Sequence, residues 1–175
     1  AKTKPFGFKP FLPGPGVGGH CIPVDPLFLS WISDKKKINS DFIKISRSVN
    51  LKVTNWVISK IKKNLPRKNS KILIIGITYK KNIDDLRESP LIKIFKSLNI
   101  PYKVDFYDTY AKKFAINKKI YFSKNNLTNI HKYDAVIIGT DHSNIDYKDV
   151  VKKAKKIFDT RGILRNIKSK KIVFC

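Results

Sequence analysis

A cysteine lies within the part of the chain that is richest in glycine and proline. Residues 11–29 read FLPGPGVGGHCIPVDPLFL, with Cys21 at the end of a run of turn-forming residues. Such a loop is either a structural corner or a device that presents a thiol to a ligand, and its composition is unlike that of ordinary core. A nucleophilic cysteine needs thiolate character, which a helix N terminus or a nearby cation promotes. We therefore take Cys21 as a candidate nucleophile.

Two neighbours of Cys21 carry groups suited to acid–base chemistry. Asp25 lies four residues further on, at an expected helix start, where its carboxylate is able to position a water molecule. His20 is a possible base, but it is adjacent to the cysteine, and adjacent side chains usually point in different directions. We interpret Asp25 as a candidate catalytic residue and His20 as structural.

The glycines of the same loop, GPGVGG at residues 14–19, satisfy the pattern G-x-G-x-x-G. A dinucleotide-binding fingerprint also needs a strand before the glycines and a helix that starts within them. Here FKPFLP precedes and HCIPVDP follows, so we expect no dinucleotide site at this loop. The glycines instead allow tight turns and a close approach of the backbone to a ligand, and Gly18 is a candidate substrate-binding residue.

A second charged loop, GITYKKNIDDLRESP at residues 76–90, follows the first apolar strand. The carboxyl ends of strands are where open α/β sheets bind ligands. The alternative is a solvated charged loop, but Arg87 is one of few arginines among many lysines, and a guanidinium suits a phosphate. Ser89 begins a helix whose N terminus also favours an anion. Lys80 lies in the same loop.

Two further strand ends carry polar groups. FDTRG at residues 158–162 places Arg161 just after a strand, and TDHSNIDY at residues 140–147 does the same for His142. Because parallel strands end at the same edge of a sheet, these groups are expected to converge on one crevice. The residues alone therefore predict a ligand that contains phosphate.

Hydrophobic periodicity divides the chain near residues 65–70. The first part is helical, with Asp25 as N-cap and Pro26 as first residue of one helix, and a longer helix from Ser40 to Leu65 whose apolar stripe faces either the core or a partner subunit. The second part alternates strands and helices, which predicts a parallel α/β sheet with helices on its faces. The expected strands lie at residues 71–77, 102–108, 134–140, 156–160 and 171–175. We expect a helical unit over residues 1–67 and an α/β unit over residues 68–175.

The high positive charge of the chain does not by itself indicate nucleic-acid binding. The net charge is +24, yet lysine is spread throughout and arginine is rare, whereas nucleic-acid readers favour arginine. A nucleic-acid partner is therefore not expected. Two cysteines far apart form no disulfide framework, and no apolar run spans a bilayer, so a cytoplasmic protein without membrane partner or metal is expected.

Four motifs, in this order, resemble one family. PFGFKPFLPGPGVGGHCIPVDP, GITYKKNIDDLRESP, GTDHSNIDY and FDTRG are similar to motifs of the UDP-glucose/GDP-mannose dehydrogenases, the nucleotide-sugar 6-dehydrogenases. His20 and Val24 stand where the UDP-glucose enzymes tend to have serine and lysine. The GHCIPVDP motif therefore resembles that of the branch of the family that oxidises UDP-N-acetylglucosamine or UDP-N-acetylgalactosamine.

The resemblance implies a mechanism with two NAD molecules, which oxidise the sugar C6 alcohol to a carboxylate through a cysteine thiohemiacetal and a thioester. It implies that Cys21 is the nucleophile and that Asp25 positions or activates water. It also implies that Lys80 is a third catalytic residue, which contacts the substrate next to Tyr79. It further implies that Arg87 reaches the cofactor and Arg161 the substrate. A Rossmann-like UDP-binding domain at the carboxyl end and a central helical region with a homodimer or higher homo-oligomer contact are also implied.

One departure from the family is large. Its members begin with an NAD-binding Rossmann domain and carry further catalytic residues before the cysteine loop, and these 175 residues have neither. The chain therefore resembles the carboxy-terminal part of such an enzyme, and alone we expect it to be inactive without the amino-terminal NAD-binding domain. The alternative is a UDP-sugar-binding or dimerisation module without chemistry.

Overall fold

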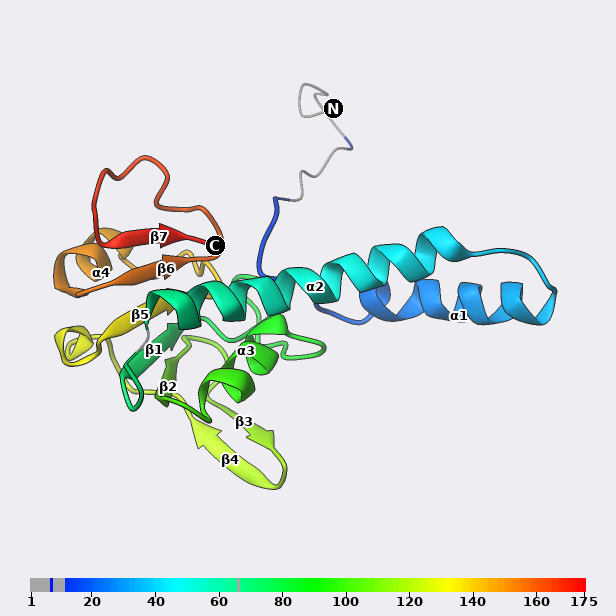
Figure 1. The fold of residues 1–175 in the computed structure, drawn as a ribbon. Coiled ribbons are helices and arrows are strands. Elements are labelled where there is room, and N and C mark those ends of the chain that lie inside the picture. Colours follow the sequence, from blue (N-terminus) through cyan, green and yellow to red (C-terminus); the bar gives the residue numbers. More distant parts are fainter. Residues whose placement is uncertain (1–6, 8–11, 66) are drawn as a thin grey trace.

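The computed structural model describes residue 7, residues 12–65 and residues 67–175 (Figure 1). Residues 8–11 of the cysteine loop, and Pro66, which was expected to close the second helix, lie outside the described residues. The helices are α1 (Cys21–Lys35), α2 (Asp41–Asn64), α3 (Pro90–Leu98) and α4 (Tyr147–Lys153), with a 3₁₀ turn at Ile130–Lys132. The strands are β1 (Lys71–Ile75), β2 (Lys103–Tyr107), β3 (Lys113–Ile116), β4 (Lys119–Phe122), β5 (Ala135–Ile138), β6 (Ile157–Asp159) and β7 (Ile172–Phe174).

Five strands form one parallel sheet in the order β2-β1-β5-β6-β7. Strand β1 lies between β2 and β5, with Ile72 opposite Val104 of β2 and Ala135 of β5. This confirms the predicted Rossmann-like parallel sheet preceded by a helical segment. The chain runs from β1 to β2 and later returns to the other side of β1, so the strand order reverses between β1 and β5. Open α/β sheets bind ligands at the carboxyl ends beside such a reversal.

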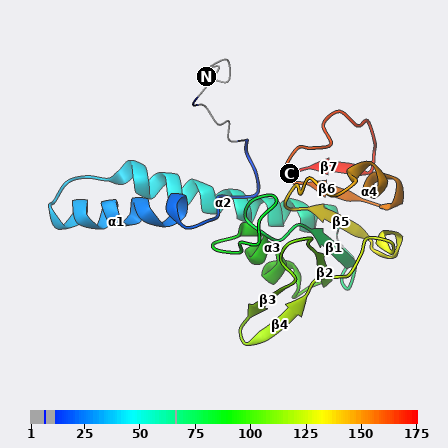
Figure 2. The ribbon, with the colours of Figure 1, turned by 180° about the vertical axis from the view of Figure 1, so that it is seen from behind.

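Both faces of the sheet are covered, as the continuous apolar runs of β1 and β5 predict. Successive side chains of a strand point to opposite faces. Ile72 and Ile74 of β1 therefore join a core cluster with α2 and α3, whereas Leu73 and Ile75 join a second cluster with α4. Figures 1 and 2 show the helices on the two sides of the sheet. The carboxyl edge of the sheet is left for loops.

Helix α3 begins at the predicted position. Ser89 is its N-cap, with the side-chain oxygen accepting a hydrogen bond from the backbone N–H of Leu91 at 3.3 Å, and Pro90 is the first helical residue. The hydroxyl of Ser89 also donates to the backbone oxygen of Ile77 at 2.7 Å. The same side chain thereby ties the start of α3 to the segment that follows β1.

The antiparallel hairpin of β3 and β4 was not predicted. Its sequence, KFAINKKIYF at residues 113–122, does not alternate regularly between apolar and polar residues, so the pattern of a half-buried strand is hidden. Asn117 and Lys118 turn the chain with φ angles of 49° and 66°, the backbone of a tight hairpin turn. Phe114 and Tyr121 of the hairpin pack against Phe95 of α3, so contact with this helix defines the strands more than the local pattern does.

Helix α2 is only half core. Its last turns bury Val57, Ile58 and Ile61 against the sheet. Its first half and α1 project beyond the α/β body as a helical arm, as Figures 1 and 2 show. Large apolar side chains are exposed along this arm: Phe28, Leu29, Trp31, Ile32, Phe42, Ile45 and Val49. Within the described residues, no helix is long and apolar enough to cross a membrane.

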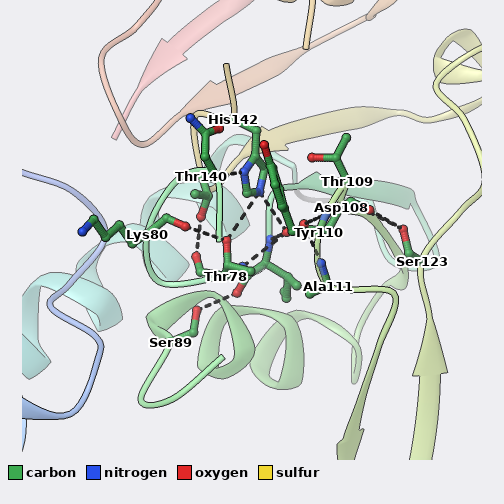
Figure 3. Close-up of polar contacts among 12 residues, drawn as sticks. Thr78, Lys80, Ser89, Asp108, Thr109, Tyr110, Ala111, Ser123, Thr140 and His142 are labelled. Carbon is green, nitrogen blue, oxygen red and sulfur yellow. Dashed lines mark hydrogen bonds and ion pairs between the residues drawn. The ribbon is translucent and has the colours of Figure 1, made fainter. Parts of the chain in front are cut away.

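A buried polar network joins the carboxyl ends of β1, β2 and β5 (Figure 3). Asp108, which follows β2, accepts hydrogen bonds from the backbone N–H groups of Ile77, Tyr110 and Ala111 at 2.7–3.0 Å. His142, which follows β5, lies 3.1 Å from Oδ2 of Asp108 through its Nε2. Neither side chain is exposed.

This network corrects the role that the sequence suggested for His142. We expected the imidazole to line a crevice at the strand ends, but it is buried beneath them. The reason is Asp108, whose buried carboxylate needs hydrogen-bond donors from several directions. The sequence held a signal for Asp108, an aspartate at the end of a strand whose alternate residues are apolar, which we did not use.

The charge of Asp108 contributes to stability. Burial alone would raise the pKa of this carboxyl, but hydrogen bonds from His142 and from the N–H groups of Ile77 and Tyr110 outweigh it, so the pKa is lowered from the usual 3.8. A group whose pKa is lowered by folding stabilises the native state above its unfolded pKa. That stabilisation is lost as the pH falls through the folded-state pKa.

The substitution Asp108→Asn should therefore lower the free energy of unfolding at pH 7 by about 2–4 kcal/mol, because its NH2 group replaces one accepting oxygen and would face N–H donors from which it cannot accept. Urea unfolding from pH 7 to pH 2 measures this, and the difference from the wild type should shrink below pH 3.8. Asp149→Asn, which removes a surface ion pair with Lys153, is the control and should cost less than about 1 kcal/mol. A pH-independent difference, or equal losses in the two variants, would contradict the account.

Candidate functional site

Cys21 is the first residue of α1, and its side chain is exposed. The helix therefore starts five residues before the predicted position, with His20 and Cys21 in the places expected for Asp25 and Pro26. Pro23 lies in the first turn of the helix, where a missing N–H costs no hydrogen bond. Pro23 and Pro26 are therefore both compatible with a helix start, and the sequence alone does not decide between them. The backbone N–H of Val24 donates to the His20 oxygen at 3.2 Å and closes the first turn. The thiol thus sits at a helix N terminus, where anions are stabilised.

Asp25 lies in α1 one turn after Cys21 and is exposed, so it is not the N-cap. His20 takes that position with an exposed side chain that makes no capping hydrogen bond. Pro26 lies inside the helix and has no N–H to offer the backbone oxygen of Ile22. Cys21 and Asp25 remain together at the amino end of the helix.

The glycines of the cysteine loop lie directly on the loop that follows β1. The N–H of Gly19 donates to the backbone oxygen of Arg87 at 2.9 Å. A Cβ at Gly18 would lie 2.5 Å from Cβ of Tyr79 and 2.9 Å from the backbone oxygen of Glu88. A Cβ at Gly19, whose φ is +90°, would lie 2.8 Å from the Tyr79 ring. Only glycine permits this approach at either position.

These contacts account for the pattern G-x-G-x-x-G without a dinucleotide. A helix does follow the glycines at Cys21, which the sequence analysis did not expect, but residues 12–20 form neither strand nor helix. The glycines face protein: Gly14 meets the guanidinium of Arg161, and Gly16 meets Thr54 and Pro90. Their function in this fold is close packing of the loop against the strand ends.

Helix α2 holds the loop from the other side. The hydroxyl of Thr54 donates to the backbone oxygen of Pro15 at 2.8 Å. The side-chain oxygen of Asn50 accepts from the N–H of Val17 at 2.9 Å. Neither α2 residue was predicted as part of the site, because a polar residue among the apolar residues of a helix face gives no sign of a long-range partner.

Arg87 lies between the two loops with 64% of its side chain exposed. Its guanidinium forms a two-point contact with Asp85, at 2.6 Å and 3.0 Å. The hydrogen bond and charge of Asp85 raise the pKa of Arg87, and the nearby Tyr79 and Cys21 add smaller contributions. The same contact lowers the pKa of Asp85. The guanidinium is thus held by Asp85, and the backbone of Arg87 contacts Gly19, two residues before Cys21.

The other predicted residues lie around the same edge. Tyr79 is half-buried against the glycines, and Lys80 is exposed. Arg161 follows β6 and is largely buried, with its Nε donating to Asp141 at 3.3 Å. Lys81 approaches the same carboxylate at 4.0 Å. The structure thus brings the cysteine loop, the loop after β1 and Arg161 together at one edge of the sheet.

Two family domains match the chain. The UDP binding domain of the UDP-glucose/GDP-mannose dehydrogenase family matches residues 73–166. The central domain of the same family matches residues 1–52.

Curated relatives match most of the chain. A protein of Methanocaldococcus jannaschii named UDP-N-acetyl-D-mannosamine dehydrogenase is 36% identical over 162 residues, which cover 87% of this chain and 36% of the relative. UDP-N-acetyl-D-glucosamine 6-dehydrogenase of Salmonella typhi is 29% identical, over 91% of this chain and 40% of the relative. The chain thus spans about two fifths of the length of these relatives.

Solved structures agree with this. UDP-D-ManNAc dehydrogenase from Pyrococcus horikoshii superimposes with a TM-score of 0.76 at 27% identity, over 99% of this chain and 41% of that one. GDP-mannose dehydrogenase from Pseudomonas aeruginosa shares the fold, with a TM-score of 0.74 at 19% identity, over 93% of this chain and 40% of that one. With the loops that carry Cys21, Tyr79 and Arg161 meeting at one edge of the sheet, the chain belongs to the UDP-glucose/GDP-mannose dehydrogenase family.

Proposed function

We propose that this chain is the carboxy-terminal part of an NAD-dependent UDP-N-acetylhexosamine 6-dehydrogenase, which oxidises the C6 alcohol of the sugar to a carboxylate. The observation that carries the proposal is the docking of the glycine-rich cysteine loop on the strand ends, through Gly18 and Gly19 on Tyr79. This docking brings a thiol to the place where an α/β sheet binds a nucleotide. The relatives named for UDP-N-acetylmannosamine and UDP-N-acetylglucosamine support the sugar class.

The nucleotide would lie over the carboxyl ends of β1, β5 and β6. Arg161 has a planar guanidinium suited to the diphosphate, and its partial burial strengthens such a contact. Lys80 supplies a second cation, and Tyr79 a ring and hydroxyl beside the backbone of Gly18. We assign substrate binding to these four residues.

Cys21 would form the covalent intermediates. After the C6 alcohol has lost a hydride and a proton, the thiolate adds to the aldehyde carbon and the oxygen gains a proton, giving a thiohemiacetal. Loss of a second hydride and the hydroxyl proton gives a thioester, and water then breaks the C–S bond to release the carboxylate and the thiol. Covalent capture divides a difficult oxidation into steps and retains the aldehyde.

Asp25 is proposed to act on the water of the last step. Its carboxylate lies one helical turn from Cys21 and is exposed, so water reaches both groups. A carboxylate that accepts a proton from this water promotes its attack on the thioester. This assigns the base to α1 itself rather than to His20.

NAD, when bound, would accept one hydride, so that two NAD molecules in turn take up the two hydrides. Among the described residues, Arg87 fits a contact to its diphosphate, because its guanidinium is exposed and stands close to Cys21. Asp85 orients that guanidinium. The remaining contacts would come from the amino-terminal part of the enzyme, which we propose as the partner of this chain.

We further propose two units, residues 1–67 and 68–175, and a homo-oligomer formed through the helical arm. The arm exposes apolar side chains on both α1 and α2, whereas the apolar residues of β1, β5 and β6 are buried. An exposed apolar surface of this kind marks an interface. A second copy of the chain is the occupant to which we commit, as the resemblance to the central domain implies.

Arg161→Ala should weaken UDP binding by the 175-residue chain about 10- to 100-fold, because charge-assisted hydrogen bonds to phosphate are lost. Isothermal titration calorimetry measures the dissociation constants. Arg67→Ala removes the same charge from an exposed position away from the strand ends and should leave the affinity nearly unchanged. Equal affinities of the two variants would reject Arg161 as a phosphate ligand.

Alkylation of Cys21 by iodoacetamide should slow about tenfold when UDP-N-acetylhexosamine is present at ten times its dissociation constant, because the sugar covers the thiol. Peptide mass spectrometry follows the rate at each cysteine. Cys175 is the internal control, because burial raises the pKa of its thiol to about 11 and keeps its reaction slow throughout. An unchanged rate at Cys21 under saturating ligand would place the sugar elsewhere.

Phe42→Ser should weaken self-association of the chain by about tenfold or more, because Phe42 is 85% exposed on the arm. Sedimentation velocity over a range of concentrations measures this. Phe122→Ser, on the exposed face of β4, is the matched control and should have no effect. A wild-type chain that stays monomeric at every concentration would overturn the dimer proposal.

A further inference from the structure

The short segment from Thr78 to Asn82 carries two proposed substrate contacts and is fixed from one side by a buried imidazole. The N–H of Asn82 donates to Nδ1 of His142 at 3.0 Å. Asn82 has a φ of 62°, a left-handed conformation that ends the segment with a sharp turn. Figure 3 shows His142 with Thr78, Thr140 and Lys80 around it.

The contacts of His142 define its tautomer. Because Nδ1 accepts a hydrogen bond from a backbone N–H, it carries no proton, and Nε2 carries the proton of the neutral ring. Nε2 therefore donates to Asp108 at 3.1 Å. Asp108 in turn accepts from the backbone of Ile77 and holds the end of β1. The imidazole thus connects Asp108 to the turn at Asn82.

Side chains of the segment complete the connection. The amide of Asn82 donates to Oγ of Ser143 at 2.8 Å and accepts from the N–H of Ser143 at 2.9 Å. The hydroxyl of Thr78 donates to the backbone oxygen of Lys80 at 3.0 Å. The hydroxyl of Thr140 donates to the backbone oxygen of Thr78. The segment is therefore joined to the residues after β5 at its beginning and at its end.

We propose that His142 is a positioning residue for substrate binding, which sets the place of Tyr79 and Lys80 by accepting the N–H of Asn82 through Nδ1. The proposal rests on the proposed function only for the roles of Tyr79 and Lys80. Without the acceptor, the exposed half of the segment keeps only side-chain contacts at its turn. Tyr79 would keep the hydrogen bond of its N–H to the backbone oxygen of Asp85 at 3.1 Å, but its ring would shift against the backbone of Gly18 and Gly19.

Two substitutions separate positioning from general stability. The side-chain oxygen of His142→Asn occupies the place of Nδ1 and keeps an acceptor for Asn82, but loses the donor to Asp108. The amide of His142→Gln reaches the place of Nε2 and keeps the donor to Asp108, but loses the acceptor. Both variants remove a buried ring, so the thermal unfolding midpoint serves to compare their general loss of stability.

Amide exchange followed by NMR in the 175-residue chain is the test. We expect the Asn82 amide to exchange about tenfold faster in His142→Gln than in the wild type, and close to the wild-type rate in His142→Asn. Equal exchange rates at Asn82 in the two variants would overturn the proposal. If a variant fails to fold, the wild-type protein still tests the proposal. A wild-type Asn82 amide that exchanges at the rate of an unprotected peptide would overturn the proposal.

UDP titration of the same proteins gives a second readout. We expect His142→Gln to bind UDP about tenfold more weakly than His142→Asn at similar unfolding midpoints. Equal affinities would overturn the positioning role. If the wild type binds no UDP, the proposed function fails while the amide exchange at Asn82 still tests the role of His142.

Discussion

The site depends on the absence of side chains at Gly18 and Gly19. The backbone of the cysteine loop lies so close to Tyr79 and Glu88 that a single Cβ at Gly18 would collide with both. This contact carries α1, and with it Cys21, to the carboxyl edge of the sheet. Asn50 and Thr54 of α2 hold the loop in place from behind. The thiol is thereby positioned by packing rather than by hydrogen bonds of its own.

The sheet supplies the rest of the constraint. Its strand order reverses between β1 and β5. Gly76 after β1, with φ +81°, passes so close to the backbone of Thr140 after β5 that a side chain would not fit. Below this crossing, Asp108 and His142 are hydrogen-bonded to each other and to the backbone N–H groups around them. These hydrogen bonds keep the loops above them in one arrangement. A buried polar network that is fully satisfied specifies a unique geometry at the surface it supports.

The sequence predicted the sheet well, because buried parallel strands are continuous apolar runs, as in residues 72–75 and 135–138. It also predicted the helix cap at Ser89, because a serine followed by a proline at this position fits only a helix start. The start of α1 was misplaced because Pro23 and Pro26 are both acceptable near a helix start, and only the docked loop decides between them. The hairpin at Asn117 was missed because its strands exist through contact with α3.

Long-range polar partners were the least predictable feature. His142 and Arg161 follow strands in the same way, yet one is fully buried against Asp108 and the other reaches Gly14 at the edge of the cysteine loop. No local pattern distinguishes them, since the difference lies in residues more than thirty positions away in the case of His142. Motif resemblance indicated which residues gather, and the fold defines which of them are buried and which lie at the edge of the sheet.

The central claim is that the cysteine loop and the strand ends form one site for a UDP-sugar. The most direct measurement is a crystal structure of the 175-residue chain with UDP-N-acetylhexosamine. We predict the diphosphate beside Arg161 and the sugar C6 beside the sulfur of Cys21. A nucleotide bound instead in the lysine-lined pocket of ≈ 540 Å³ at the amino ends of β1 and β2, or a sugar turned away from Cys21, would contradict the account.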